Sequence, residues 1–174
     1  MEFRKGLIAD AGRIAELVNS AYRGESSRLG WTTEADLLGG QRTDMNEVSG
    51  LIGRDESFFI LCEREGDLIA SVHLERNGES ASLGMLAVKP ELQGKGIGKL
   101  LLLEAEREAV ESWGVGKMRM AVIAFRHELI EFYERRGYRP TGLFAPFPAD
   151  PKFGIPKVPD LSFEWLEKPV GGSS

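Results

Sequence analysis

The sequence predicts an α/β fold of the α+β type, with helices packed on a mixed, mostly antiparallel sheet. Three consecutive strand-like runs occupy residues 57–63, 68–74 and 80–88. The connections Glu65-Gly66-Asp67 and Asn77-Gly78 have turn chemistry, which favours an antiparallel meander. Immediately afterwards the apolar spacing becomes helical over residues 96–113, with Gly114 at the stop position.

The N-terminal part is expected to add a short strand over residues 3–8. Asp10 then stands as N-cap of a helix whose apolar positions continue to Tyr22. Residues 23–54 are polar and glycine-containing, and we expect only short helices there, around residues 33–38 and 45–52.

The C-terminal part predicts a strand over residues 117–123, a helix over 126–136 and a final strand over 161–166. Six of the eight prolines fall between Arg139 and Asp160. Proline removes a backbone donor and fixes φ, so we expect an ordered but irregular loop in this segment.

Length and composition indicate one compact domain over residues 1–168 with a flexible tail at 169–174, since the chain has 174 residues of which 42% are hydrophobic. No apolar run resembles a membrane span or a signal peptide, and we expect a soluble, cytoplasmic protein. One cysteine and two histidines leave too few ligands for a structural zinc site, so no metal is expected.

The net charge of −5 argues against nucleic acid and anionic membrane as partners, because both require a basic face. An acidic chain also suits a cationic acceptor such as an amine, although most acidic proteins are acidic only for solubility.

The most informative segment runs from Leu83 to Leu100, where an apolar strand leads through a glycine-rich turn into a leucine-rich helix. Glycines expose backbone N–H groups, and a helix start adds unpaired N–H groups and the positive end of its dipole. A pyrophosphate fits such a turn. The dinucleotide-binding fingerprint fails because Lys99 takes the place of its third glycine, and the nucleotide-triphosphate loop fails because Gln93 takes the place of its first.

Gln93, Gly94, Gly96 and Gly98 have the spacing of the acetyl-CoA signature of the GNAT family of N-acetyltransferases, which this stretch resembles. The resemblance implies a sheet of six to seven strands with about four helices, and acetyl-CoA as acyl donor. It places the pantetheine arm on the backbone of the preceding strand and the pyrophosphate on the turn. The cofactor-binding residues so implied are Leu86, Ala87, Val88, Gln93, Gly94, Lys95, Gly96, Ile97, Gly98, Lys99, Arg126 and Tyr133.

A second motif, Glu131 to Tyr138, resembles the family's helix that ends in tyrosine, a charged run, glycine and an aromatic residue. By this match Tyr133 is the candidate general acid, because a phenol with a pKa near 10 stays protonated at neutral pH and can donate to the departing thiolate. Many members carry asparagine where this chain has Arg126, which either reaches a CoA phosphate or caps the helix.

The general base stays open. His73 and Glu75 are the preferred candidates, with Glu79 and Glu34 as alternatives, while His73 also fits a residue on the solvent face of its strand. The predicted function is transfer of acetyl from acetyl-CoA directly to a primary amine of a small molecule or peptide. A catalytically silent CoA-binding module, another acyl group and a hydroxyl acceptor remain alternatives, and a homodimer is left open.

Overall fold

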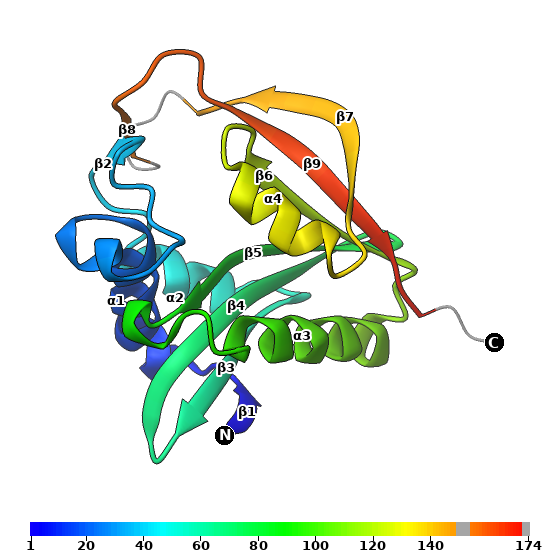
Figure 1. Ribbon diagram of the computed structural model, residues 1–174. Coiled ribbons are helices and arrows are strands. Elements are labelled where there is room, and N and C mark those ends of the chain that lie inside the picture. Colours follow the sequence, from blue (N-terminus) through cyan, green and yellow to red (C-terminus); the bar gives the residue numbers. More distant parts are fainter. Residues whose placement is uncertain (149–153, 172–174) are drawn as a thin grey trace.

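The protein is described by a computed structural model that covers residues 1–148 and 154–171. Its main element is a seven-stranded sheet in the order β1-β3-β4-β5-β6-β9-β7 (Figure 1). The strands are β1 Glu2–Lys5, β3 Ser57–Arg64, β4 Asp67–Asn77, β5 Ser80–Val88, β6 Lys117–Ile123, β9 Ser162–Pro169 and β7 Arg139–Pro146. Only β5 and β6 pair in parallel, so the predicted mixed, mostly antiparallel sheet is confirmed.

The described chain has four α-helices, three short 3-10 helices and one small additional sheet. The α-helices are α1 Ala11–Tyr22, α2 Met45–Gly53, α3 Ile97–Trp113 and α4 His127–Glu134. The 3-10 helices are η1 Ile8–Asp10, η2 Glu25–Leu29 and η3 Pro90–Leu92. The small sheet pairs β2 Leu38–Gly39 with β8 Ile155–Pro156.

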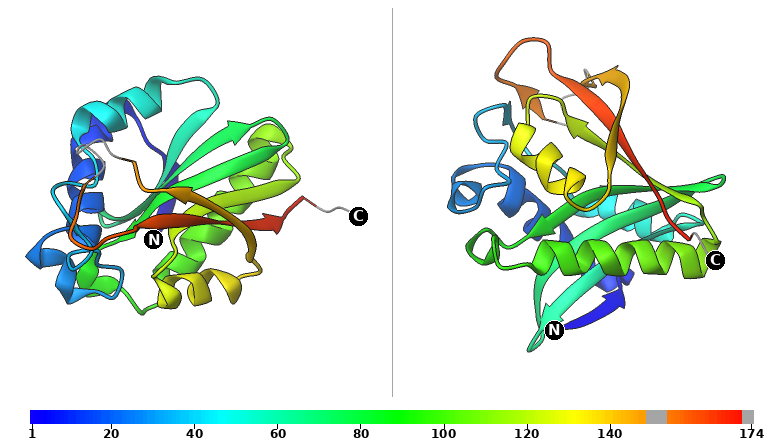
Figure 2. Two further views of the ribbon diagram at one scale, coloured as in Figure 1. Left: turned by 90° about the horizontal axis from the view of Figure 1, so that it is seen from above. Right: turned by 45° about the vertical axis from the view of Figure 1, so that its right-hand side comes forward.

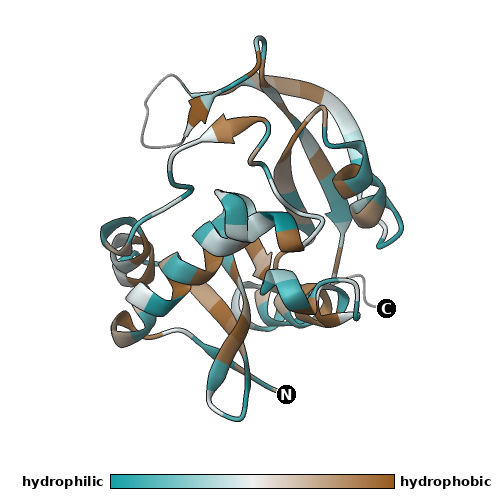
Figure 3. Cartoon of the chain, turned by 60° about the vertical axis from the view of Figure 1, so that its left-hand side comes forward, coloured by the Kyte–Doolittle hydropathy of each residue, from teal (hydrophilic) through white to brown (hydrophobic). Residues whose placement is uncertain are grey.

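Helices cover both faces of the central strands (Figures 1 and 2). Along β3, Ile60 and Cys62 belong to the core with α3 and α4, whereas Phe59 and Leu61 belong to the core with α1 and α2. Successive side chains of a strand point to opposite faces, so a strand covered on both faces must be apolar at successive positions. Figure 3 shows the same pattern as apolar stretches along the central strands and the inner sides of the helices.

The sheet is split between β5 and β6. Their parallel pairing joins only Ser80–Ser82 to Lys117–Arg119, and the strands then diverge (Figure 1). In the diverging part, β5 has an irregularity at Met85, whose φ of 51° lies in the left-handed region, and its register with β4 shifts there. The later half of β5 therefore presents one edge without a strand partner in the sheet.

The prediction of an irregular loop between Arg139 and Asp160 was wrong in part, because the first residues of this segment form β7. β7 lies at the edge of the sheet and pairs only with β9, so the missing N–H groups of Pro140 and Pro146 are tolerated. The expected helix around residues 33–38 is instead a turn that leads into β2. Residues 149–153 of the predicted loop and 172–174 of the predicted tail lie outside the described residues.

Residues 169–171, assigned to the tail from sequence, are bonded to the body of the fold. Pro169 ends β9, opposite Lys117, and the Val170 amide donates to Gly116 O at 3.0 Å.

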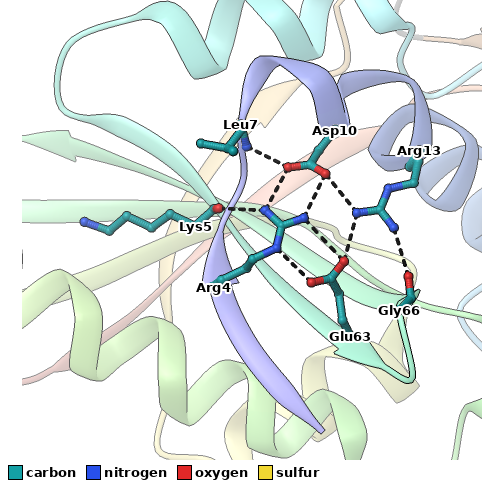
Figure 4. Close-up of polar contacts among 7 residues, drawn as sticks. All are labelled: Arg4, Lys5, Leu7, Asp10, Arg13, Glu63 and Gly66. Atoms are coloured by element: carbon teal, nitrogen blue, oxygen red, sulfur yellow. Dashed lines mark hydrogen bonds and ion pairs between the residues drawn. The ribbon is translucent and has the colours of Figure 1, made fainter.

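Asp10 occupies the predicted N-cap position of α1, but its carboxylate does not cap the helix. It accepts from the Leu7 amide at 2.8 Å, takes both terminal nitrogens of Arg4 at 2.9 Å, and pairs with Arg13 (Figure 4). Glu63 on β3 binds the same two arginines. The hydrogen bond from Arg4 is the largest cause that holds the pKa of Asp10 well below its usual range. This network fixes α1 to β1 and β3 and so sets the position of the helix that ends at Tyr22.

Candidate active site

The glycine-rich turn between β5 and α3 exposes a series of backbone donors. Gly94 and Gly96 have φ of 81° and 86°, in the region that favours glycine. Backbone bonding stops at the Gln93 amide, which donates to Pro90 O, and resumes at the Leu100 amide, which donates to Gly96 O. Within the described residues, the amides of positions 94–99 find no acceptor. This arrangement is an anion-binding site at a helix N-terminus.

A cavity of about 250 Å³ lies beside this turn, between β5, α3 and α4. Of the predicted cofactor residues it is lined by Leu86, Val88, Gln93, Gly94, Gly96, Ile97, Gly98 and Lys99. Ala87 instead packs in the core under α1, and Lys95 is exposed at the turn. Lys99, Arg135 and Arg136 add positive charge to the cavity wall, which suits phosphate groups.

The Gln93 side chain has a structural role at the edge of this cavity. Its Oε1 accepts from the amides of Trp31 at 2.7 Å and Thr32 at 3.2 Å, while its Nε2 donates to Thr32 Oγ1 and to Val88 O. Gln93 therefore attaches the turn to the segment after η2. Because the Gln93 amide also donates to Pro90 O, any contact from Gln93 to a bound phosphate would have to compete with bonds that it already makes.

A second cavity, of about 390 Å³, lies where β5 and β6 diverge. Its polar lining includes Arg23, Glu34, Arg42, Glu47 and His73, and Tyr133 reaches it from α4. Tyr22, Leu86 and Leu129 line both cavities, so the two adjoin. A volume in this range fits a small molecule.

Two tyrosines lie in this region: Tyr22 lines both cavities, and Tyr133 lines the larger one. Tyr133 is 4% exposed and its ring packs edge-on against Phe132 and Tyr138. Burial raises the pKa of Tyr133 well above its usual range, and burial raises the pKa of Tyr22 to about 12. The Tyr22 hydroxyl donates to the carbonyl oxygen of Leu86, in the irregular part of β5. Both hydroxyls thus stay protonated at neutral pH.

The two preferred base candidates differ in their surroundings. His73 lines the larger cavity, its Nε2 lies 2.8 Å from Ser57 Oγ, and burial lowers its pKa to about 4. Glu75, two residues further along β4, is ion-paired with Arg54 and does not line that cavity. Glu79 is exposed beside the β4–β5 turn.

Glu34 and Arg126 belong to one buried ion cluster. Glu34 is 8% exposed and lies between Arg23, with Nε 3.0 Å from Oε1, and Arg126, with Nη1 3.7 Å from Oε2. Arg126 Nη2 also donates to Trp31 O at 3.3 Å. Arg126 therefore ties α4 to the segment after η2, and it lines neither cavity.

Sequence reasoning missed Arg42, Glu47, Arg135 and Arg136 as lining residues. Arg135 and Arg136 fall inside the tyrosine motif described above. Their positive charge was the available sequence signal for a phosphate-binding role. Arg42 and Glu47 lie in the aperiodic segment before and within α2, where the sequence offers no motif.

Comparison with known proteins now gives the family. The model of the acetyltransferase (GNAT) family matches residues 14–138. The chain therefore belongs to the GNAT family of acetyltransferases.

Solved structures show the same fold at low identity. A ribosomal-protein-alanine N-acetyltransferase from Brucella melitensis is 21% identical, with a TM-score of 0.71 and coverage of 98% of this chain and 100% of that chain. A structure described as a putative phosphinothricin N-acetyltransferase is 17% identical, with a TM-score of 0.71 and 99% of both chains covered. A chimeric spermidine N-acetyltransferase from Vibrio cholerae is 16% identical, with a TM-score of 0.69 and coverage of 97% and 96%.

The described residues contain neither a helix suited to cross a membrane nor a cluster of side chains suited to a metal ion. No helix in residues 1–148 and 154–171 has the length and apolar character needed to cross a membrane. The same residues contain no group of three or more His, Cys, Asp or Glu side chains suited to a metal ion.

Proposed function

We propose that this GNAT protein transfers the acetyl group of acetyl-CoA to a primary amine of a small molecule or peptide. The observation that carries the proposal is the pair of adjoining cavities at the divergence of β5 and β6. One cavity offers free amides and cations for a phosphorylated donor. The other is lined by Tyr133 and polar side chains suited to an acceptor.

The donor would bind along β5 and across the glycine turn. The amides of residues 94–99 are available to the pyrophosphate, because they have no acceptor within the described protein. Lys99, Arg135 and Arg136 supply charge for phosphate oxygens. The edge of β5 around Leu86 and Val88 has no strand partner, so its backbone can bind the pantetheine amides in the manner of an added strand. The carbonyl oxygens of Leu86 and Val88 already accept from Tyr22 and Gln93, and pantetheine would share or displace these bonds.

At the thioester, the neutral amine attacks the acetyl carbonyl carbon, a C–N bond forms, and the C–S bond to CoA breaks. The nitrogen then releases one proton, which balances the proton that the CoA thiolate takes up. The departing thiolate then needs a hydrogen-bond donor. Tyr133 supplies one from the wall of the acceptor cavity. Because burial raises the pKa of Tyr133 above its usual range, we assign it as a donor that stays protonated until the thiolate forms beside it.

The amine must lose a proton before attack, at a cost of about 4 to 5 kcal/mol for an amine of pKa near 10.4 at pH 7. Of the candidates from sequence, His73 and Glu34 line the acceptor cavity, and Glu34 is held between two arginines. Because its pKa is lowered, His73 is neutral at pH 7 and can accept a proton from the amine. The same low pKa means that His73 passes this proton on readily to water. We therefore assign His73 as the general base. Glu75, which is ion-paired with Arg54, has a supporting electrostatic role.

The structural neighbours bear names with different acceptors, namely ribosomal-protein alanine, phosphinothricin and spermidine. The test is therefore release of free CoA thiol from acetyl-CoA with a panel of amines, alcohols and peptides, with product identified by mass spectrometry. Amine-dependent thiol release with an N-acetyl product supports the proposal. CoA binding without transfer to any acceptor contradicts it and favours a silent module.

A further inference from the structure

The charged groups that line the acceptor cavity define the acceptor more narrowly. We propose that the acceptor is a zwitterionic amine of amino-acid type with an apolar side chain, whose carboxylate binds the guanidinium of Arg42. The inference rests on the proposed function and adds the chemical class of its acceptor.

The backbone at Arg42 is fixed in place by a clamp from α1. Asn19 Oδ1 accepts from the amides of Arg42 at 2.7 Å and Thr43 at 3.0 Å, and Asn19 Nδ2 donates to Thr43 O at 2.8 Å. The clamp positions a half-buried arginine on the wall of the acceptor cavity. A side chain that starts from a fixed backbone loses less entropy when it binds a ligand.

The Arg42 guanidinium is available to a ligand. Within the described part of the chain it makes no hydrogen bond and no ion pair, whereas Arg23 and Arg126, its neighbours in this region, share Glu34. Its charge nevertheless reaches the cavity walls. Burial lowers the pKa of both His73 and Arg23, and the nearby Arg42 charge lowers both further. An unpaired, partly desolvated guanidinium recognises a carboxylate through two parallel hydrogen bonds.

The cavity also contains the complementary group for an ammonium. Glu47 on α2 lines it and accepts a hydrogen bond from the Thr43 hydroxyl. Glu47 and Arg42 form no ion pair with each other in the described structure. Two opposite charges that line one cavity without pairing match a zwitterion, which carries its own charges apart.

The remaining lining selects the side chain of the acceptor. Leu83, Met120, Val122, Phe147 and Phe163 give the cavity apolar walls. Two arginines (Arg23 and Arg42) and two glutamates (Glu34 and Glu47) line the cavity, so the lining carries no net formal charge, although the whole chain has a net charge of −5. The overall acidity therefore does not describe this site, and a zwitterion without net charge matches it better than a polycationic acceptor.

The test compares acceptors that differ only in the carboxylate, such as phenylalanine with phenethylamine and leucine with 3-methylbutylamine. We expect kcat/KM to be at least about tenfold higher for the amino acid of each pair, since a bidentate charge-assisted contact is among the stronger hydrogen-bonding interactions. Arg42→Gln should raise KM for the amino acid at least about tenfold, with little change in kcat and none for the decarboxylated amine. Arg42→Lys should retain part of the preference.

Arg64→Gln is the matched control, because Arg64 is exposed at the end of β3 and lines neither cavity. Equal turnover of both members of each pair, unaffected by Arg42→Gln, would overturn the assignment of Arg42 and leave the acetyltransferase proposal intact. Absence of transfer to every amine, with CoA still bound, would overturn the proposed function itself. Should Arg42→Gln fail to fold, the matched pairs on the unmodified protein decide alone.

Discussion

His73 makes the acceptor cavity sensitive to acid, and the effect on stability follows from its surroundings. Its Nε2 lies 2.8 Å from Ser57 Oγ, its ring packs 4.9 Å from the ring of Phe59, and burial lowers its pKa to about 4. The ordinary pKa is 6.5. Because the unfolded chain binds this proton more readily than the folded protein, protonation favours unfolding. The stability linked to neutral His73 is present above pH 6.5 and is lost as the pH falls from 6.5 towards 4.

The loss of unfolding free energy depends on how far the pH lies below 6.5, the pKa of His73 in the unfolded chain. At pH 5 the unfolded histidine is protonated and the folded one is still neutral, so the loss is roughly 1.5 units, or about 2 kcal/mol at about 1.4 kcal/mol per unit. Below pH 4 the loss levels off at about 3.5 kcal/mol. Partial access of water to the cavity would reduce both values.

The assay is urea unfolding at pH 7.5 and pH 5, with the difference in unfolding free energy taken within each protein. The unmodified protein should lose about 2 kcal/mol more between these pH values than His73→Gln. His127→Gln is the matched control, because His127 is exposed at the start of α4 and should leave the difference unchanged. An equal pH dependence in the unmodified protein and His73→Gln would refute the reasoning.

Three further predictions concern the site and its support. Tyr133→Phe should lower turnover on the order of 100-fold while calorimetry finds CoA affinity nearly unchanged; an unaltered rate would remove the donor assignment. Gly98→Ala should weaken CoA binding with stability kept or raised, since its new Cβ lies 3.6 Å from Phe132 inside the cofactor cavity and alanine favours helix. Gly96→Ala, at φ 86°, should instead cost about 1 kcal/mol of stability, and identical behaviour of the two variants in thermal melts would contradict this contrast. Asp10→Asn should cost about 1–2 kcal/mol in urea unfolding because charge-assisted bonds to Arg4 and Arg13 are lost, and a change within error would show that these bonds add nothing.

The parts of the fold that the sequence predicted well have strong local signals. β5 and β6 begin and end at the predicted residues, because each is an apolar run bounded by glycine or turn residues. α3 follows one residue after the predicted start, at Ile97, since Gly96 is in the left-handed conformation outside the helix. β7 was missed because its prolines suggested a loop, and only its place at the sheet edge makes them acceptable.

In the candidate site, too, local motifs were predictable, whereas residues positioned by contacts distant in the sequence were not. The glycine turn and Tyr133 were predicted because each belongs to a contiguous motif, and the structure places both at the cavities. Arg42 was out of reach, because its position depends on a clamp from Asn19 on another helix. Likewise, no sequence motif indicates that Arg126 pairs with Glu34, or that the Gln93 side chain is hydrogen-bonded to Trp31 and Thr32.

The most direct test of a CoA site on the glycine turn is the unfolding temperature of the protein with CoA and with pantetheine, which lacks the pyrophosphate. A ligand at about 100 times its Kd stabilises a protein by roughly 2.7 kcal/mol. We predict a clear rise in unfolding temperature with millimolar CoA and a much smaller one with pantetheine. No rise with CoA, or an equal rise with both compounds, would contradict the binding of the donor's pyrophosphate by the amides of residues 94–99.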